Sequence, residues 1–142
     1  MTATQSAIRA AVAARVDAIS GEWKESRFLP DRLGYDPSSV AHLAFSVDLP
    51  NGRAAGNRQK PTIYQQETVV VRFTFRVHPK DQLISYDAAN DAENALITQL
   101  LATGWASTFQ LVYVGSARST LETGEWRRHE ITFNALFYLS TE

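Results

Sequence analysis

The chain has 142 residues, of which 44% are hydrophobic and 20% are charged, and its formal net charge is −1. This length and composition are typical of one globular domain with a hydrophobic core, without the strong basic excess of a chain that binds nucleic acid throughout its length. Because the sequence has no cysteine, disulfides, thiolate catalysis and cysteine-based zinc sites are excluded. No apolar run reaches the roughly 18–20 residues of a membrane span, so no membrane partner is expected.

The first predicted element is an amphipathic helix. Ile8, Val12, Val16 and Ile19 recur at spacings of four, four and three residues, which places them on one helical face. Gly21 follows at the position where a left-handed C-terminal cap is expected. The helix therefore has one face that must pack against another element.

Residues 22–39 form the next segment, which has no regular pattern. Pro30 and Pro37 interrupt it, and its aromatic residues are interleaved with charged ones. The segment is too apolar for an exposed linker, so we expect it to pack on the domain or against a partner. Trp23 and Phe28 are its candidate interface residues.

Two strands with a long loop between them are predicted in the centre of the chain. Val40–Asp48 is typical of a short strand, and Glu67–Val77 alternates apolar with mostly polar residues, which predicts one buried and one wetter face. The loop at 49–66 has no acidic residue and three basic ones, which are Arg53, Arg58 and Lys60. A solvated loop and a contact arm that orders on binding are both compatible with a loop of this length.

The second half of the chain is predicted to hold a helix and two strands. The helix has Ser85 at its N-cap and Gly104 just past its C-terminus, both residue types favoured there. Phe109–Gly115 and Trp126–Leu139 have strand patterns and are joined by a polar connection at 116–125. The order α-β-β-α-β-β predicts a single α+β domain over residues 1–142, in which a mainly antiparallel sheet of four strands, or slightly more, packs against two helices.

No sequence motif indicates catalysis or cofactor binding. A phosphate-binding loop requires Gly-Lys-Ser/Thr leading into a helix, whereas Lys60 is followed by Pro61 and a predicted strand. No Gly-x-Ser-x-Gly nucleophile elbow is present. We therefore expect a protein that is not an enzyme and has no catalytic residues and no cofactor.

Histidines and the carboxylates of the second helix are the remaining candidates for chemistry. Three histidines lie on or beside predicted strands: His42, His78 and His129. Their spacing matches no metal-binding pattern, so we interpret them as partly exposed strand residues and expect no metal site. Three acidic residues lie around the second helix: Asp87, Asp91 and Glu93. No apolar sequence surrounds them, so a solvated helix face is favoured over a catalytic pair.

Four further residues are candidate interface residues: Arg72, Arg76, Trp126 and Arg127. The first two lie on the polar face of the central strand, where they extend the positive surface of the loop or keep that face wet. A tryptophan beside arginine is a common composition of interface hot spots, and Trp126 is equally compatible with a core position at the entrance of its strand.

Two segments and the order of elements resemble the tail terminator proteins of long-tailed, lambda-like bacteriophages. VVVRFTFRVHPKDQLISYDAANDAENALITQLL is similar to the family's long strand, proline-containing turn and following helix. GEWRRHEITFNALFYL is similar to its closing Gly-x-Trp and final strand. The resemblance covers most of the chain, and it is one of spacing and element order rather than a catalytic signature.

The resemblance implies a structural virion protein that assembles as a homohexameric ring. Family members cap the growing tail tube, end polymerisation of the tube protein and present a surface to the completed head. The implied partners are therefore the chain itself, the tail tube protein and the head–tail connector protein, with DNA only in transit through the channel. The implied location is the tail or neck of the virion, after assembly in the host bacterial cytoplasm.

Two alternatives stay open at this point. A head–tail connector, or another neck or tube-end component, is compatible with the same pattern. A small nucleic-acid-binding module that acts through the basic loop is a more distant alternative, because three basic residues per chain are few for tight binding.

Overall fold

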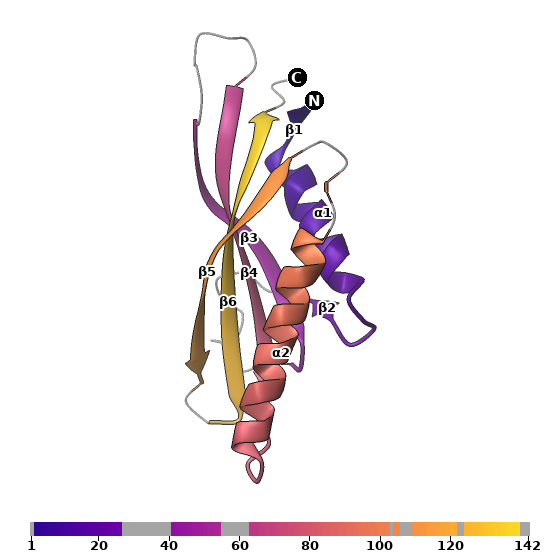
Figure 1. The fold of residues 1–142 in the computed structure, drawn as a ribbon, viewed down its shortest axis with the longest axis vertical. Coiled ribbons are helices and arrows are strands. Elements are labelled where there is room, and N and C mark those ends of the chain that lie inside the picture. The colour runs from indigo at the N-terminus through magenta and orange to yellow at the C-terminus, as the bar shows by residue number, and fades with distance from the viewer. Residues whose placement is uncertain are drawn as a thin grey trace.

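The computed structural model describes residues 2–26, 41–54, 63–102, 104–105, 109–121 and 124–139. These residues form an α+β fold with two helices and six strands (Figure 1). In chain order the elements are β1 (Thr2–Ala3), α1 (Gln5–Asp17), β2 (Lys24–Glu25), β3 (Ala44–Ala54), β4 (Ile63–Arg76), α2 (Gln82–Leu101), β5 (Gln110–Thr120) and β6 (Trp126–Leu139). The predicted helices and long strands are present in the predicted order, and β1 and β2 are additions to it.

The six strands form one mixed sheet. At its centre β4 and β6 pair antiparallel over their full length, from Ile63 opposite Leu139 to Arg76 opposite Trp126. β3 pairs antiparallel with the other side of β4, and β5 pairs antiparallel with the other side of β6. The two short strands are parallel to their neighbours: β1 lies beside the end of β6, and β2 lies beside the start of β3. The predicted antiparallel arrangement therefore holds for the four long strands only.

Both helices cover the same face of the sheet and bury its apolar side chains (Figure 1). The sheet contributes alternating residues of β4 and β6 to this core: Val69, Val71, Phe73, Ile131, Phe133, Ala135 and Phe137. The helices contribute Ile8, Val12, Val16, Leu96 and Leu100. Burial of each large aliphatic side chain contributes about 1.5–3 kcal/mol, so this layer is the main source of stability.

The capping residues Thr4 and Ala18 mark the two ends of α1. Thr4 is the N-cap, and its hydroxyl accepts a hydrogen bond from the N–H of Ala7 at 3.2 Å. Ala18 is a right-handed C-cap, and Gly21 is not in the left-handed region. The predicted cap at Gly21 is therefore wrong, because the helix already ends at Asp17.

Helix α2 begins ahead of the predicted N-cap, Ser85. Asp81 is the N-cap, because its carbonyl accepts the first helical hydrogen bond from the N–H of Ser85 at 2.9 Å. The hydroxyl of Ser85 instead accepts from the N–H of His78 at 3.0 Å. At the other end Ala102 is a right-handed C-cap and Gly104 is not left-handed, so the predicted cap at Gly104 is also wrong. Neither α1 nor α2 is both long and apolar enough to cross a membrane, and no other helix occurs in the described ranges.

The hairpin of β3 and β4 is longer than predicted. The predicted loop at 49–66 is strand at both of its ends, because Asn51 pairs with Thr68 and Ala54 pairs with Gln65. Residues 55–62 lie outside the described residues. The ladder continues past Asp48 because a bulge there absorbs the irregular Leu-Pro sequence that interrupted the strand pattern.

Strand β5 is also longer than predicted, because it runs to Thr120. The predicted polar connection at 116–125 is therefore strand over its first half, where Ser116 pairs with Ile131 and Thr120 pairs with Arg127. Its polar residues led to the prediction of a loop, because β5 is an edge strand in which most side chains are exposed. Gly124, in the turn to β6, has a φ of 72°, which favours glycine.

The sheet face opposite the helices is drier than the alternation predicted. Val70, Arg72 and Thr74 of β4 are buried there. The guanidinium of Arg72 lies between two carboxylates, with Nη1 3.3 Å from Asp48 Oδ2 and Nε 3.1 Å from Glu130 Oε2. The charge of the buried Arg72 is therefore paired with two half-buried carboxylates, one on β3 and one on β6.

Candidate functional site

The sheet ends on one side at β5, and the outer edge of β5 has no strand partner among the described residues. β5 is 11 residues long and pairs with β6 along its inner edge (Figure 1). It contains no proline and one charged residue, Arg118, whose side chain bonds back to Glu93 of α2. Such an edge presents backbone N–H and C=O groups to an approaching strand.

The opposite edge, at β3, is protected in three ways. β2 pairs with its first two residues. A bulge interrupts its ladder between Asp48 and Asn51. Pro50, within that bulge, has no N–H to donate to a neighbouring strand. Covering segments, bulges and proline are the means by which proteins prevent pairing at an edge. β5 also has a register shift, between Tyr113 and Gly115, but it has no proline and no strand on its outer edge among the described residues, so it is the less protected edge.

Large apolar side chains are exposed along the open edge. Val112, Tyr113 and Val114 of β5 are 49%, 40% and 56% exposed, and Leu101 at the end of α2 is 43% exposed. We call these four residues the β5 surface. Apolar area beside an unpaired strand edge is typical of a protein–protein contact site.

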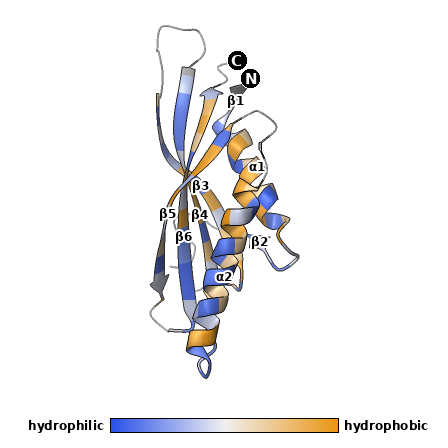
Figure 2. Cartoon of the chain, viewed as in Figure 1, coloured by the Kyte–Doolittle hydropathy of each residue, from blue (hydrophilic) through white to orange (hydrophobic). Residues whose placement is uncertain are grey.

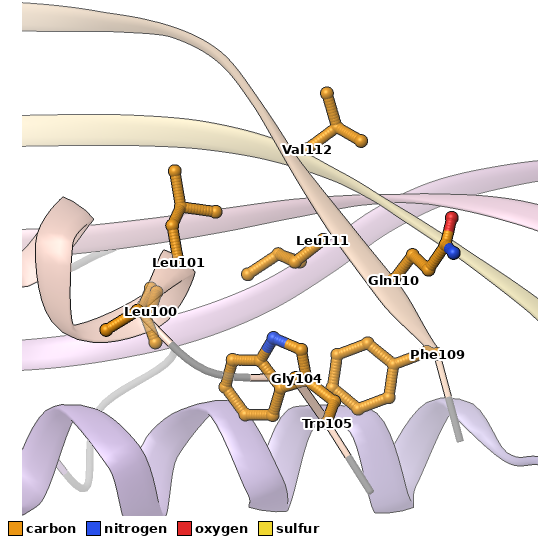
Figure 3. Close-up of a pocket in the computed structure, with 9 residues that line it drawn as sticks. Leu100, Leu101, Gly104, Trp105, Phe109, Gln110, Leu111 and Val112 are labelled. Atoms are coloured by element: carbon orange, nitrogen blue, oxygen red, sulfur yellow. The ribbon is translucent and has the colours of Figure 1, made fainter. Parts of the chain in front are cut away.

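An open hollow of about 340 Å³ adjoins the β5 surface where α2 ends and β5 begins. Figure 3 shows the rings of Trp105 and Phe109 side by side, with Leu100, Leu101 and Leu111 around them. The two rings stack with their centroids 4.8 Å apart. The guanidinium of Arg15, from α1, lies 3.4 Å from the centroid of the Trp105 ring. The lining is mainly apolar and therefore suits an apolar group.

A second exposed apolar feature lies at the other end of α2. Leu83 and Ile84, in the first helical turn, are 79% and 69% exposed. Figure 2 shows a hydrophobic band at this end of the helix. The buried face of α2 consists of other residues: Ser85, Ala89, Glu93, Leu96 and Leu100. We call Leu83 and Ile84 the α2 tip.

An ionic cluster around the buried Glu93 and His129 links β5 and β6 to α2, with the half-exposed Arg118 as its third member. Glu93 is 2% exposed and accepts two hydrogen bonds from Arg118, from Nε to Oε1 at 3.0 Å and from Nη2 to Oε2 at 2.6 Å. Nδ1 of His129 lies 2.8 Å from Oε1 of Glu93, and the histidine ring stacks on Phe73. We call Glu93, Arg118 and His129 the Glu93 cluster.

Hydrogen bonds and burial set the protonation states of the Glu93 cluster. Nε2 of His129 accepts from Nε of Arg127 at 3.4 Å, so a neutral ring that donates from Nδ1 to Glu93 satisfies both neighbours. Burial lowers the pKa of His129, and the hydrogen bond to Glu93 opposes this only in part. Burial raises the pKa of Glu93, but the hydrogen bonds from Arg118 and His129 outweigh it, and the net pKa is lowered. The cluster therefore holds a neutral histidine and an ionised glutamate at neutral pH.

The burial of Glu93 and His129 indicates a structural role for the Glu93 cluster. His129 is 0% exposed, not partly exposed as predicted, so no substrate reaches its ring. Asp87 and Asp91 are exposed as predicted, whereas the predicted solvation of Glu93 is wrong because the side chain faces the core side of α2. In the ranges that the structure describes, no three acidic or histidine side chains are grouped to hold a metal ion.

The predicted loop residues are only partly within the described structure. Arg53 lies on β3 and is exposed. Arg58, Lys60 and Phe28 lie outside the described residues. Trp23 is 3% exposed and packs against Phe45 and Phe73, so it is a core residue of the protomer.

The other candidate interface residues do not form one surface. Arg72 is buried on the sheet face opposite the helices. Arg76 is exposed at the end of β4, and Trp126 is half-buried at the start of β6. Arg127 is half-buried, with its guanidinium 4.2 Å from the centroid of the Tyr86 ring.

The sequence analysis missed both the α2 tip and the β5 surface. A signal for the tip existed, because Leu83 and Ile84 do not fall on the helical face that contains Ala89 and Leu96. The predicted helix begins at Ser85, after both residues, so the prediction did not include them. The β5 surface had no comparable signal, since the pattern of a strand does not tell whether its outer edge is covered.

Neither a protein-family model nor a curated protein sequence matches the chain. Among solved structures, the chain is similar to one from the virion of a native gene transfer agent particle. The similarity covers 97% of this chain and 99% of that chain, with a TM-score of 0.68 and 17% sequence identity. At this identity the comparison establishes a shared fold over nearly the full length of both chains.

Proposed function

We propose that the protein is a structural virion protein that caps a phage tail tube as a hexameric ring. The observation that carries the proposal is the similarity of fold, over nearly the whole of both chains, to a chain from a gene transfer agent virion. The resemblance of its second half to tail terminator proteins supports the more specific role, in which the ring ends tube polymerisation and forms the interface for head attachment.

The open side of the sheet supports assembly into a ring. A protomer that leaves the β5 surface exposed, and covers only the start of the β3 edge with β2, has its less protected edge at β5. In a ring each subunit uses one patch to contact a different patch on the next subunit, and repetition of that contact closes the ring. The β5 surface is one of these two patches.

The basic loop is assigned to the rim or the lumen of the ring. Six copies of Arg53, Arg58 and Lys60 would gather positive charge around a channel through which DNA passes, or around the contact with the tube end. Phe28, Arg76 and Trp126 are proposed as further contact residues. The partners are the tail tube protein and the head–tail connector protein, the location is the tail or neck of the virion, and the protein performs no catalysis.

Tube polymerisation tests this function directly. Purified tail tube protein is allowed to polymerise with and without the protein, and tube lengths are measured by electron microscopy. We expect rings at tube ends and an arrest of growth. The variant Arg53→Glu/Arg58→Glu/Lys60→Glu should stay folded but cap poorly, and Asp91→Asn serves as the exposed control.

A pull-down separates the tail terminator from the alternatives. Binding to the head–tail connector protein without binding to the tube would contradict capping and assign the chain to the neck. Affinity for DNA should be weak and should fall steeply with salt, because three basic residues per protomer neutralise few phosphates. Submicromolar DNA binding by the protomer at physiological salt would favour the nucleic-acid-binding module.

A further inference from the structure

We propose that the α2 tip of one protomer docks in the hollow of a second copy of the chain, beside that copy's β5 surface. The inference deepens the proposed function, on which it rests for the existence of a ring, by naming the two patches that meet. The inserted group is the pair Leu83 and Ile84, and the receiving group is the apolar lining around Trp105 and Phe109.

The α2 tip has the properties of an inserted apolar group. Its two large aliphatic side chains are 79% and 69% exposed. They sit on the first turn of a 20-residue helix, so docking them requires little ordering of the backbone. Burial of two such side chains is a strong driving force for association.

The hollow has the chemistry to receive them. Leu100, Leu101, Leu111 and two stacked aromatic rings surround an open volume of about 340 Å³ (Figure 3). Because more of its lining is apolar than polar, the hollow fits an apolar side chain better than a charged ligand. The same chain supplies a matching apolar group, so a second copy is the occupant that we favour.

Charges of opposite sign lie near the two patches. The carboxylates of Asp81 and Asp87 are exposed near the α2 tip, together with the cation of Lys80 and the guanidinium of Arg127 on the Tyr86 ring. Asp81 makes no side-chain capping bond to its own helix. At the hollow, the guanidinium of Arg15 lies over Trp105 and bonds to the carbonyl of Gly104 at 3.1 Å. Docking of the tip would bring the carboxylates of Asp81 and Asp87 toward the guanidinium of Arg15, a pairing of opposite charges.

The two patches cannot meet within one protomer, because they lie at opposite ends of α2. A helix of 20 residues is about 30 Å long. The contact is therefore heterologous, from the head of one copy to the tail of the next. Heterologous contacts propagate until they close into a ring or continue as a filament.

Two variants remove one patch each. Leu83→Ser/Ile84→Ser removes the tip from exposed positions. Gly104→Trp fills the hollow, and its fold is expected to survive because a Cβ at Gly104 meets no atom within 4 Å and the backbone there is not left-handed. We expect each variant to weaken self-association at least about tenfold in sedimentation velocity. Tyr138→Ser, at an apolar position 46% exposed on β6, is the matched control and should leave self-association unchanged.

Mixing the two variants gives the sharper test. The tip variant retains its hollow and the filled variant retains its tip, so an equimolar mixture should form dimers and nothing larger. Self-association of the tip variant equal to that of the wild type, a mixture that stays monomeric, or a wild type that is monomeric at all concentrations would each overturn the proposal. Capping of tubes is measured separately. If the wild type caps tubes and the tip variant self-associates as the wild type does, this contact alone is refuted. If self-association depends on the tip but the wild type does not cap tubes, the proposed function alone is refuted.

Discussion

At one edge of the sheet, β3 is paired with β2 and contains Pro50, whereas at the other edge β5 has no proline and no outer strand among the described residues, and it exposes Val112 and Val114. Both edge strands contain a register shift, so the difference lies in the covering strand and the proline. An exposed edge strand can pair with other chains, so a difference in protection between the two edges bears on where another chain would bind. The difference favours the β5 side over the β3 side as the proposed contact with another copy of the chain.

The two sides also differ in how they are fastened to the body of the protein. On the β5 side a single carboxylate, Glu93, is shared by Arg118 and His129. On the β3 side a single guanidinium, Arg72, is shared by Asp48 and Glu130. Loss of one acid on the β3 side leaves Arg72 with the other, but loss of Glu93 leaves the buried His129 without its carboxylate partner, while Arg118, 43% exposed, can be solvated.

The largest effect is therefore expected from Glu93→Gln. Glu93→Gln should cost about 1.5–3 kcal/mol of unfolding free energy, because the buried His129 loses a charged hydrogen-bond partner, whereas Arg118 is 43% exposed and can be solvated. Asp48→Asn should cost less than about 1 kcal/mol, because Arg72 retains Glu130 and Asp48 is partly exposed. Urea denaturation of both variants measures the difference.

Asp91→Asn is the control for that comparison, since Asp91 lies on the exposed side of the same helix. Its unfolding free energy should stay within about 0.5 kcal/mol of the wild type. Equal losses for Glu93→Gln and Asp48→Asn would show that the two sides are fastened alike.

Two lysine substitutions on β5 test whether this edge contacts another copy of the chain. Val112→Lys/Val114→Lys places two ammonium groups on the β5 surface, where they oppose pairing or apolar contact with a neighbour. We expect self-association to weaken at least about tenfold, which is about 1.4 kcal/mol, with little change in protomer stability. Sedimentation velocity measures the first and urea denaturation the second. Asn51→Lys, an exposed position on β3, should leave self-association intact; an equal loss there would erase the distinction between the edges.

Acidification should loosen the β5 side. Burial holds the pKa of folded His129 below its ordinary value of about 6.5, so the unfolded chain takes up the proton first and stability falls as the pH drops below that value. The pKa of Glu93 is also lowered, so its contribution is lost at still lower pH, as the pH falls through its folded value. Urea denaturation between pH 7 and 5 measures the effect, and an NMR titration identifies the ring. A His129 ring that titrates at or above 6.5, or stability that rises on acidification, would contradict the cluster's geometry.

The smallest effect is expected at Gly104. A glycine outside the left-handed region with open space at its Cβ tolerates alanine, which restricts the unfolded chain and stabilises by about 0.4–1 kcal/mol. Gly104→Ala should therefore raise the midpoint of urea denaturation slightly. A loss of more than about 1 kcal/mol would restore the helix cap that the sequence suggested and that the structure lacks.

The fold was largely predictable because the periodic segments were long. The alternation through Val69, Val71 and Phe73 and that through Ile131 and Phe133 both mark strands that pack under the helices. The strand ends were not predictable, because pairing at the tip of a hairpin depends on the partner strand more than on local sequence. β1 and β2 have two residues each, too few to show any period.

The buried cluster was partly encoded in the same periods. Glu93 is four residues after Ala89 and three before Leu96, and His129 is two before Ile131, so both fall on core-facing positions. The prediction placed Glu93 on a solvated face because glutamate is charged, although its position is core-facing and a buried charge is stable where it is paired. The open edge of β5 was not encoded, since only the assembled sheet shows which strand ends it.

The most direct test of the central claim, that the β5 side joins copies of the chain into a ring, is native mass spectrometry of the purified protein over a range of concentrations, alone and with tail tubes. The account predicts a hexamer for the wild type and for Asn51→Lys, and its loss in Val112→Lys/Val114→Lys. A protein that stays monomeric both alone and with tubes, or a hexamer unaffected by the two lysines, would contradict it.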